Sequence, residues 1–145
     1  MSIIRFFVED TKFSLPEKPL LKKWIIKTIK EEGLLFSELC YIFCSDRYLL
    51  QMNQDFLHHD TLTDIITFDT SEKNNNIEGE IYISIERVKE NADTLNESFY
   101  RELHRVLIHG VLHLCGYKDK TNMEQTLMRM KENHYLELLK KMDKS

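Results

Sequence analysis

The 145-residue chain has little cysteine, no long apolar run and no excess of positive charge. Its three cysteines, Cys40, Cys44 and Cys115, are too few and odd in number for a disulfide framework. No apolar run is long enough to span a membrane. The first ten residues reach Glu9 and Asp10 before an apolar segment of the signal-peptide type forms. We therefore expect a cytoplasmic protein without a membrane span.

The formal net charge of −4 argues against a protein that binds nucleic acid through a broadly basic surface. Two segments nevertheless carry local positive charge, and both also fit an ordinary solvent-exposed helix face. One contains Lys18, Lys22, Lys23, Lys27 and Lys30, and the other contains Arg101, His104 and Arg105. An enzyme that acts on RNA through local charge is therefore compatible with this composition.

A chain of this length without internal repeats or linkers is expected to form one domain, residues 1–145. The apolar patterns predict four strands, over 3–8, 39–44, 63–68 and 79–84. They also predict five helices, over about 19–32, 46–57, 84–95, 99–115 and 122–142. Leu127, Met130, His134, Leu138 and Leu139 are expected on the buried side of the last helix. This order indicates an α+β or mixed α/β fold with one small mixed sheet.

The most informative stretch is His109-Gly110-Val111-Leu112-His113, in which two histidines lie four residues apart. At ~100° per residue, positions i and i+4 of a helix stack on one face, so two such imidazoles can hold one metal ion. The helix is apolar nearly all round, so we expect it to be central and buried. An unpaired buried polar group costs about 1–3 kcal/mol, and a metal ion would satisfy both imidazoles. Two polar residues on a partly exposed helix face are the alternative.

Gly116 and Asp119 follow this pair directly. Gly116 suits a helix end, because glycine accepts the left-handed conformation that a helix end often needs. The chain can then turn back and bring Asp119 near the histidines as a third potential ligand. Two histidines and one carboxylate leave at least one coordination position open, which distinguishes a catalytic metal site from a closed structural one.

Other polar residues have two interpretations each. His58 and His59 are adjacent and point apart, so they fit a loop beside a cleft better than a shared ion. Asp64 and Glu80 are expected in the two strands that flank a polar loop. They lie there either on an exposed strand face or in a position to orient a metal-bound imidazole or a water.

Two further histidines are not expected to join the pair. His104 lies five residues before His109, about 140° away round the helix. His134 lies in the last predicted helix and is expected to be a structural or surface residue.

Gly110 occupies the position after the first histidine. In metalloproteases with the pattern H-E-x-x-H, a glutamate stands there as general base. Glycine inside a helix costs about 1 kcal/mol relative to alanine, which makes sense where another backbone or a substrate passes close. The pattern therefore argues against a peptidase of that type.

Residues 109–117, HGVLHLCGY, closely resemble the signature H-G-x-L-H-L-x-G-Y-D-H of the YbeY family, bacterial metal-dependent endoribonucleases. The family's other segments, L-N, D, T-D-V-L-S-F and G-D-I-x-I-S, have counterparts in the same order and spacing. These counterparts are Met52-Asn53, Asp60, residues 63–68 and residues 79–84. The resemblance covers roughly residues 40–125.

The resemblance implies a zincin-like α+β fold with a central metal-binding helix. It implies one ion, usually zinc, held by three histidines, with His109 and His113 in the first two ligand positions. It further implies hydrolytic cleavage of single-stranded RNA, in 3′-end maturation of 16S rRNA and late ribosome quality control, with the small ribosomal subunit as partner. We expect the metal to activate water for phosphodiester hydrolysis.

Two positions depart from the family pattern. The third family histidine falls on Asp119, whose carboxylate can bind zinc but also suits other divalent metals. The family's usual arginine before the T-D segment aligns with Leu57, which removes a phosphate contact. Arg105 and Lys118 are candidates to replace it, as are Arg101 and a neighbouring imidazole.

Two other functions stay open at this point. One is a metallopeptidase-like hydrolase, against which the glycine after the first histidine counts. The other is a non-catalytic, metal-binding ribosome-assembly factor, which the missing arginine keeps open.

Overall fold

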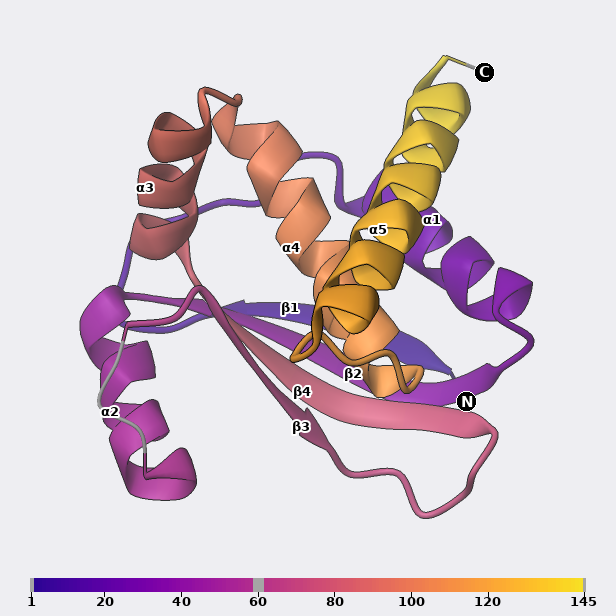
Figure 1. Ribbon diagram of the computed structural model, residues 1–145, viewed down its shortest axis with the longest axis horizontal. Helices are drawn as coiled ribbons and strands as arrows, with labels where there is room; N and C mark the ends of the chain where they lie inside the picture. Colours follow the sequence, from indigo (N-terminus) through magenta and orange to yellow (C-terminus); the bar gives the residue numbers. More distant parts are fainter. Residues whose placement is uncertain (1, 59–61, 145) are drawn as a thin grey trace.

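The computed structural model describes residues 2–58 and 62–144, and these form four strands and five helices (Figure 1). In chain order they are β1 Ile3–Val8, α1 Lys18–Glu31, β2 Leu35–Cys44, α2 Asp46–Leu57, β3 Ile65–Asp69, β4 Asn76–Ser84, α3 Ile85–Leu95, α4 Phe99–Leu114 and α5 Asn122–Asp143. This confirms the predicted number and order of elements. Among the described residues, every helix is too short or too polar to cross a lipid bilayer.

The strands form one mixed sheet in the order β1-β2-β4-β3. β1 and β4 both run parallel to β2, and β3 runs antiparallel to β4. Parallel neighbours need long crossover connections. Here α1 lies in the connection from β1 to β2, and α2 lies in the connection from β2 to β4. The fold is therefore α+β with a four-stranded mixed sheet, as predicted.

Two strands are longer than predicted, and one begins later. β2 begins at Leu35 and β4 at Asn76, because these residues pair with each other and extend the parallel ladder. β4 begins with the polar residue Asn76, and the start of β2 lies beside a bulge between Phe36 and Glu38. Strand propensity alone therefore does not reveal these first residues. β3 begins at Ile65, so Asp64 precedes the strand, and its predicted place within the strand is wrong.

The main core lies between the sheet and the three helices α1, α4 and α5, which share one side of it (Figure 1). The strand residues Leu39, Tyr41 and Phe43 face this core and are fully buried. The Tyr41 hydroxyl donates to the Leu107 carbonyl at 3.0 Å and thereby ties the sheet to α4. A smaller cluster around Leu49 packs α2 against the other side of the sheet.

Gly110 lies at a close contact between α4 and the sheet. A Cβ atom at this position would meet Ile81 Cγ2 at 2.9 Å and Ile65 Cδ1 at 3.0 Å. The close approach at this glycine is made by isoleucine side chains of β3 and β4, and not by another backbone or a substrate as expected. It holds the His109 turn of α4 directly above the sheet.

The buried side of α5 differs from the prediction. Leu127, Met130 and His134 are exposed, whereas Leu139 is buried and Leu138 is partly buried. The buried residues are Met128, Glu132, Tyr135, Leu136 and Leu139. Both sets recur at helical spacing, and the observed set contains a charged residue. Counting apolar side chains therefore placed Leu127, Met130 and His134 wrongly, and it overlooked Glu132.

Candidate metal centre

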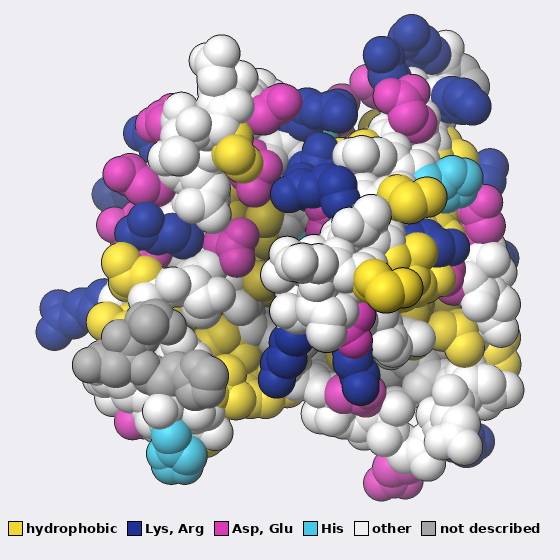
Figure 2. Space-filling model, viewed as in Figure 1, with side chains coloured by type: hydrophobic (Ala, Val, Ile, Leu, Met, Phe, Trp, Pro, Cys, Tyr) yellow, Lys and Arg dark blue, Asp and Glu magenta, His cyan; other side chains and the backbone are white. Residues whose placement is uncertain are grey.

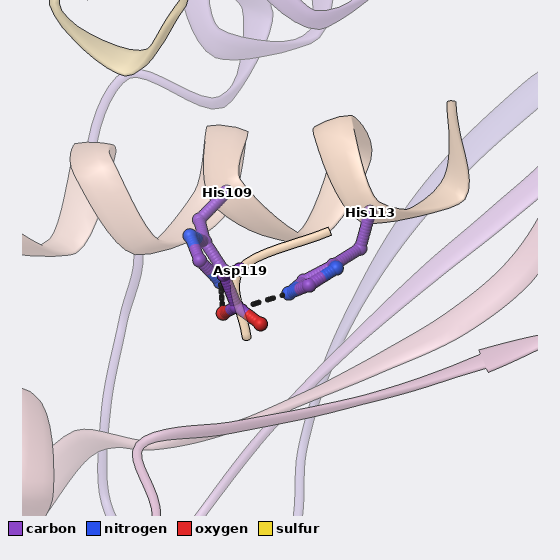
Figure 3. Close-up of side chains that lie close together, drawn as sticks. All are labelled: His109, His113 and Asp119. Atoms are coloured by element: carbon purple, nitrogen blue, oxygen red, sulfur yellow. Dashed lines mark hydrogen bonds and ion pairs between the residues drawn. The ribbon is translucent and has the colours of Figure 1, made fainter. Parts of the chain in front are cut away.

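His109 and His113 lie one turn apart on α4 with their imidazole centroids 4.5 Å apart. The Nε2 atom of each ring lies 3.3 Å from the same oxygen, Oδ2 of Asp119 (Figure 3). One ligand atom from each of the three side chains lies within 4.8 Å of the others, so the three could hold one metal ion. The structure thus brings together the three residues that the spacing singled out.

The loop after α4 folds back because of Gly116. This residue has φ of +109°, in the left-handed region where glycine is favoured. The Gly116 N–H donates to the His113 carbonyl at 2.9 Å, and the Tyr117 N–H donates to the Leu112 carbonyl at 3.0 Å. Asp119 then lies over the helix end, two residues before Thr121, the N-cap of α5.

A largely buried carboxylate anchors this loop. Glu32, at the end of α1, accepts hydrogen bonds from the Tyr117 hydroxyl at 2.6 Å, from Lys131 Nζ at 3.2 Å and from the Tyr135 hydroxyl. Burial alone would raise the pKa of Glu32, but the three donors together hold this pKa below its ordinary value of 4.5. The contact of Tyr117 with α1 and α5 therefore fixes the segment that carries Asp119.

The Nδ1 atoms of the two imidazoles have acceptors of their own. His113 Nδ1 lies 3.0 Å from the Tyr117 carbonyl, which can only accept, so this nitrogen donates. His109 Nδ1 lies 2.6 Å from Oε2 of Glu132 on α5. Burial lowers the pKa of His109, but the hydrogen bond and charge of Glu132, with the charges of Asp119 and Asp64, raise it overall. Both rings are therefore held with Nε2 toward Asp119.

This donor set fits a divalent transition metal. Imidazole nitrogen and carboxylate oxygen are ordinary zinc ligands, and acceptors on the distant nitrogens are typical of metal-binding histidines. The carboxylates of Asp119, Glu132 and Asp64 add negative charge around the imidazoles, which favours a cation there. Three protein ligands leave a fourth position free for exchange in a tetrahedral site.

A cleft of about 610 Å³ opens beside the cluster, between α2, β3, α4 and α5. Its lining includes His109, His113 and Asp119 together with Asn53 and Leu57 of α2. Figure 2 shows a hollow near the centre of this face, with Lys and Arg side chains along its rim. The cluster therefore faces a space large enough for part of a polymer.

Among the remaining candidates, Asp64 and Arg105 line this cleft, whereas Glu80 does not belong to its lining. Burial is the main cause of the raised pKa of Asp64. Glu80 alternates with Ile81, which faces the core, so its side chain lies on the other face of the sheet. Lys118 is exposed beside Asp119 but is not among the residues that line the cleft. His59 lies outside the described residues.

Sequence reasoning missed three residues of this region: Glu132, Arg129 and Lys120, all of which line the cleft. Arg105 is mostly committed elsewhere, because its guanidinium contacts Glu132 at 3.1 Å and Asn133 at 3.0 Å. Arg129 also contacts Glu132, at 3.4 Å, but its side chain is 56% exposed and so remains open to a ligand. The sequence signal for Glu132 was its position within the helical spacing of apolar residues on α5.

His104 and His134 lie away from the cluster, as expected. His104 packs beside Trp24 on another face of α4, with ring centroids 6.2 Å apart, and burial lowers its pKa. His134 lies on the surface of α5 and contacts Glu31 at 3.0 Å.

Comparisons with known proteins agree on one family. The sequence model described as Endoribonuclease YbeY matches residues 7–140. A relative of that name from Cytophaga hutchinsonii is 55% identical over 137 residues, which cover 94% of this chain and 96% of the relative. Another, from Amoebophilus asiaticus, is 52% identical over 92% of this chain and 90% of the relative. A solution structure from Thermotoga maritima superposes with a TM-score of 0.66 at 32% identity, covering 94% of this chain and 89% of that one.

Proposed function

The chain belongs to the YbeY family of endoribonucleases, hydrolases that act on phosphodiester bonds, and on this premise we propose how and where it acts. It is a single domain, residues 1–145, that cleaves single-stranded RNA with the help of one zinc ion. It acts in the cytoplasm, in 3′-end maturation of 16S rRNA and in late quality control of the small ribosomal subunit.

One observation carries the catalytic part of this proposal: two Nε2 atoms and one carboxylate oxygen converge at the wall of a cleft. His109, His113 and Asp119 hold the ion. When bound, such an ion supplies Lewis-acid chemistry, because it acidifies water and offsets negative charge that develops on a phosphate. Zinc suits the two imidazoles and the carboxylate, and the carboxylate also admits other divalent metals.

Arg129 and Lys120 are the proposed phosphate contacts. Both line the cleft with the cluster, and Arg129 is largely exposed. They stand in for the arginine that the family pattern places at Leu57, which lines the same cleft. Arg105 lines the cleft too, but its contacts with Glu132 and Asn133 commit it to holding α5.

Asp64 is the carboxylate that we assign to substrate or water. Orienting an imidazole is already the task of other groups, since the Nδ1 atoms of His109 and His113 contact Glu132 and the Tyr117 carbonyl. Asp64 lines the cleft, and its raised pKa suits a group that exchanges a proton with water or with a ribose hydroxyl.

A peptidase activity is disfavoured by the packing of Gly110. A glutamate base at this position would have to enter the contact with Ile81 and Ile65. The relatives are also named as endoribonucleases rather than peptidases.

The test is cleavage of an end-labelled single-stranded RNA oligonucleotide by metal-free protein to which zinc is added stepwise. Wild type gains activity up to one equivalent of zinc, and His113→Ala does not. His134→Ala, a surface histidine on α5, is the matched control and retains activity. Equal cleavage by His113→Ala, or undiminished cleavage by metal-free wild type, would contradict the proposal.

The cellular part is tested separately. Cells depleted of the protein accumulate 16S rRNA with an unprocessed 3′ end, and wild type restores processing. Restoration by His113→Ala would show that the role of the protein in ribosome maturation does not need the metal centre, which would contradict this part of the proposal.

A further inference from the structure

Glu132 is a buried carboxylate of α5 that contacts His109 at Nδ1, the ring nitrogen that does not face Asp119. Its side chain is only 5% exposed, and its Oε2 atom lies 2.6 Å from Nδ1 of His109. We infer that Glu132 is a positioning residue, which holds the His109 ring in the tautomer and orientation that present Nε2 to a metal ion. This inference rests on the proposed metal centre and adds a residue outside its ligand set.

The direction of the hydrogen bond sets the tautomer. An ionised carboxylate can only accept, so Nδ1 of His109 carries the hydrogen in this contact. In the neutral ring, Nε2 then carries a lone pair, and this nitrogen faces Asp119 Oδ2 at 3.3 Å. A ring with the other tautomer would present N–H where the metal is to bind.

Glu132 is itself held from its other oxygen. Arg105 Nη1 contacts Oε1 of Glu132 at 3.1 Å and also contacts Asn133 Oδ1 at 3.0 Å. The Arg105 side chain is 14% exposed, so this ion pair is largely withdrawn from solvent. Arg129 Nη1 lies 3.4 Å from the same Oε1 atom. One oxygen thus binds guanidinium groups, while the other stays directed at His109.

The two histidines differ in their acceptors. His113 relies on the backbone carbonyl of Tyr117, which belongs to the loop that carries Asp119. His109 relies on a charged side chain of a separate helix. A carboxylate acceptor orients the ring and makes its other nitrogen a stronger donor to metal, and loss of such an acceptor costs about 10–100-fold in metal affinity.

A purely structural role would give a different result. The Arg105–Glu132 pair also links α4 to α5, and breaking a buried ion pair destabilises a protein whether or not it touches a ligand. Stability alone therefore cannot test the inference. The tautomer of His109 and the affinity for zinc can test it, because a link between helices does not directly change either of them.

Glu102 offers a matched control. It lies on α4 two turns before His109, it is also 5% exposed, and it lines the same cleft. The contact to His109 Nδ1 is made by Glu132 instead. Glu102→Gln therefore removes a buried carboxylate from the same space and leaves the acceptor of His109 in place.

The experiment compares wild type, Glu132→Gln, Glu132→Ala and Glu102→Gln. Zinc affinity is measured by competition with a chromophoric chelator, and long-range ¹H–¹⁵N NMR of the metal-free proteins reports which nitrogen of His109 is protonated. We expect Nδ1 protonation in wild type, zinc binding weakened about 10–100-fold in Glu132→Ala, a smaller loss in Glu132→Gln, and a change below about twofold in Glu102→Gln.

Zinc binding by folded Glu132→Ala within about twofold of wild type would overturn the inference. In wild type, a neutral His109 ring that carries its hydrogen on Nε2 would also overturn the inference. If Glu132→Ala does not fold, the isosteric Glu132→Gln decides, since an unchanged affinity there combined with Nε2 protonation removes the positioning role. None of these readouts uses RNA, so wild type that binds zinc as expected but leaves RNA intact would refute the proposed function alone.

Discussion

Asp119→Ala separates metal binding from folding. The Asp119 side chain is 41% exposed, and it contacts the two imidazoles at 3.3 Å. Exposed ion pairs contribute about 0–1 kcal/mol, so the metal-free variant should lose no more than about 1 kcal/mol of unfolding free energy. Structural zinc sites in small peptides contribute roughly 10–16 kcal/mol from four ligands, or ~3 kcal/mol per ligand. The loss of one ligand therefore weakens zinc binding by about 100-fold.

This difference can be read from unfolding by urea with and without zinc. At a free zinc concentration of about 100 times the wild-type Kd, binding raises the unfolding free energy of wild type by ~2.7 kcal/mol. In Asp119→Ala the same concentration is close to Kd, and the gain falls to ~0.4 kcal/mol. Asp93→Ala, an exposed carboxylate on α3, should behave as wild type. An equal zinc-induced gain in Asp119→Ala would refute the assignment of Asp119 as a ligand.

Three further predictions follow from the packing and the charges. Gly110→Ala gains about 1 kcal/mol of helix propensity but overpacks Ile81 at a cost of about 1–3 kcal/mol, so urea unfolding should show a net loss, and a more stable variant would contradict this. The lowered pKa of Glu32 means that its stabilisation is full above its unfolded value of 4.5 and is lost as pH falls through the folded value. The stability difference between wild type and Glu32→Gln should therefore shrink below about pH 4.5, and a constant difference would contradict the hydrogen-bonded carboxylate. Arg129→Gln should weaken RNA binding to metal-free protein and reduce the slope of log K against log salt by about 0.7, whereas Arg101→Gln, on a different surface, should not. Zinc affinity should be kept in Arg129→Gln, because Arg105 still holds Oε1 of Glu132 at 3.1 Å.

The ligand cluster was predictable because its geometry is local. His109 and His113 are joined by one helical turn, and Asp119 follows after a glycine that ends the helix. The spacing along the chain therefore determined which atoms could meet. The burial of α4 was also predictable, because it has more apolar residues than one face of a helix can hold.

The residues around the cluster depended on packing between distant segments. Glu132 is 23 positions from His109, and it meets that residue only because α5 presents one particular stripe to α4. Two sets of residues on α5 have helical spacing, and Leu127, Met130 and His134 of the predicted set are exposed. Arg105 was expected near the site and lines the cleft, but its contact with Glu132 depends on how α5 packs on α4, which its position in the sequence does not reveal.

The strand candidates show the same limit in another form. Asp64 and Glu80 occupy similar positions in sequence, on either side of a polar loop. Asp64 precedes β3, whereas Glu80 lies within β4 on the face away from the core, so the start of β3 and the alternation along β4 decide where the two side chains lie. Asp64 lines the cleft and Glu80 does not, a distinction that local propensity cannot make.

X-ray absorption at the zinc edge, on protein loaded with one equivalent of zinc, tests the coordination of His109, His113 and Asp119 most directly. We predict nitrogen and oxygen ligands at about 2.0–2.1 Å, together with outer-shell scattering from two imidazole rings. A sulfur ligand at about 2.3 Å, contributed by one of the three cysteines, or a spectrum without imidazole scattering would contradict the account.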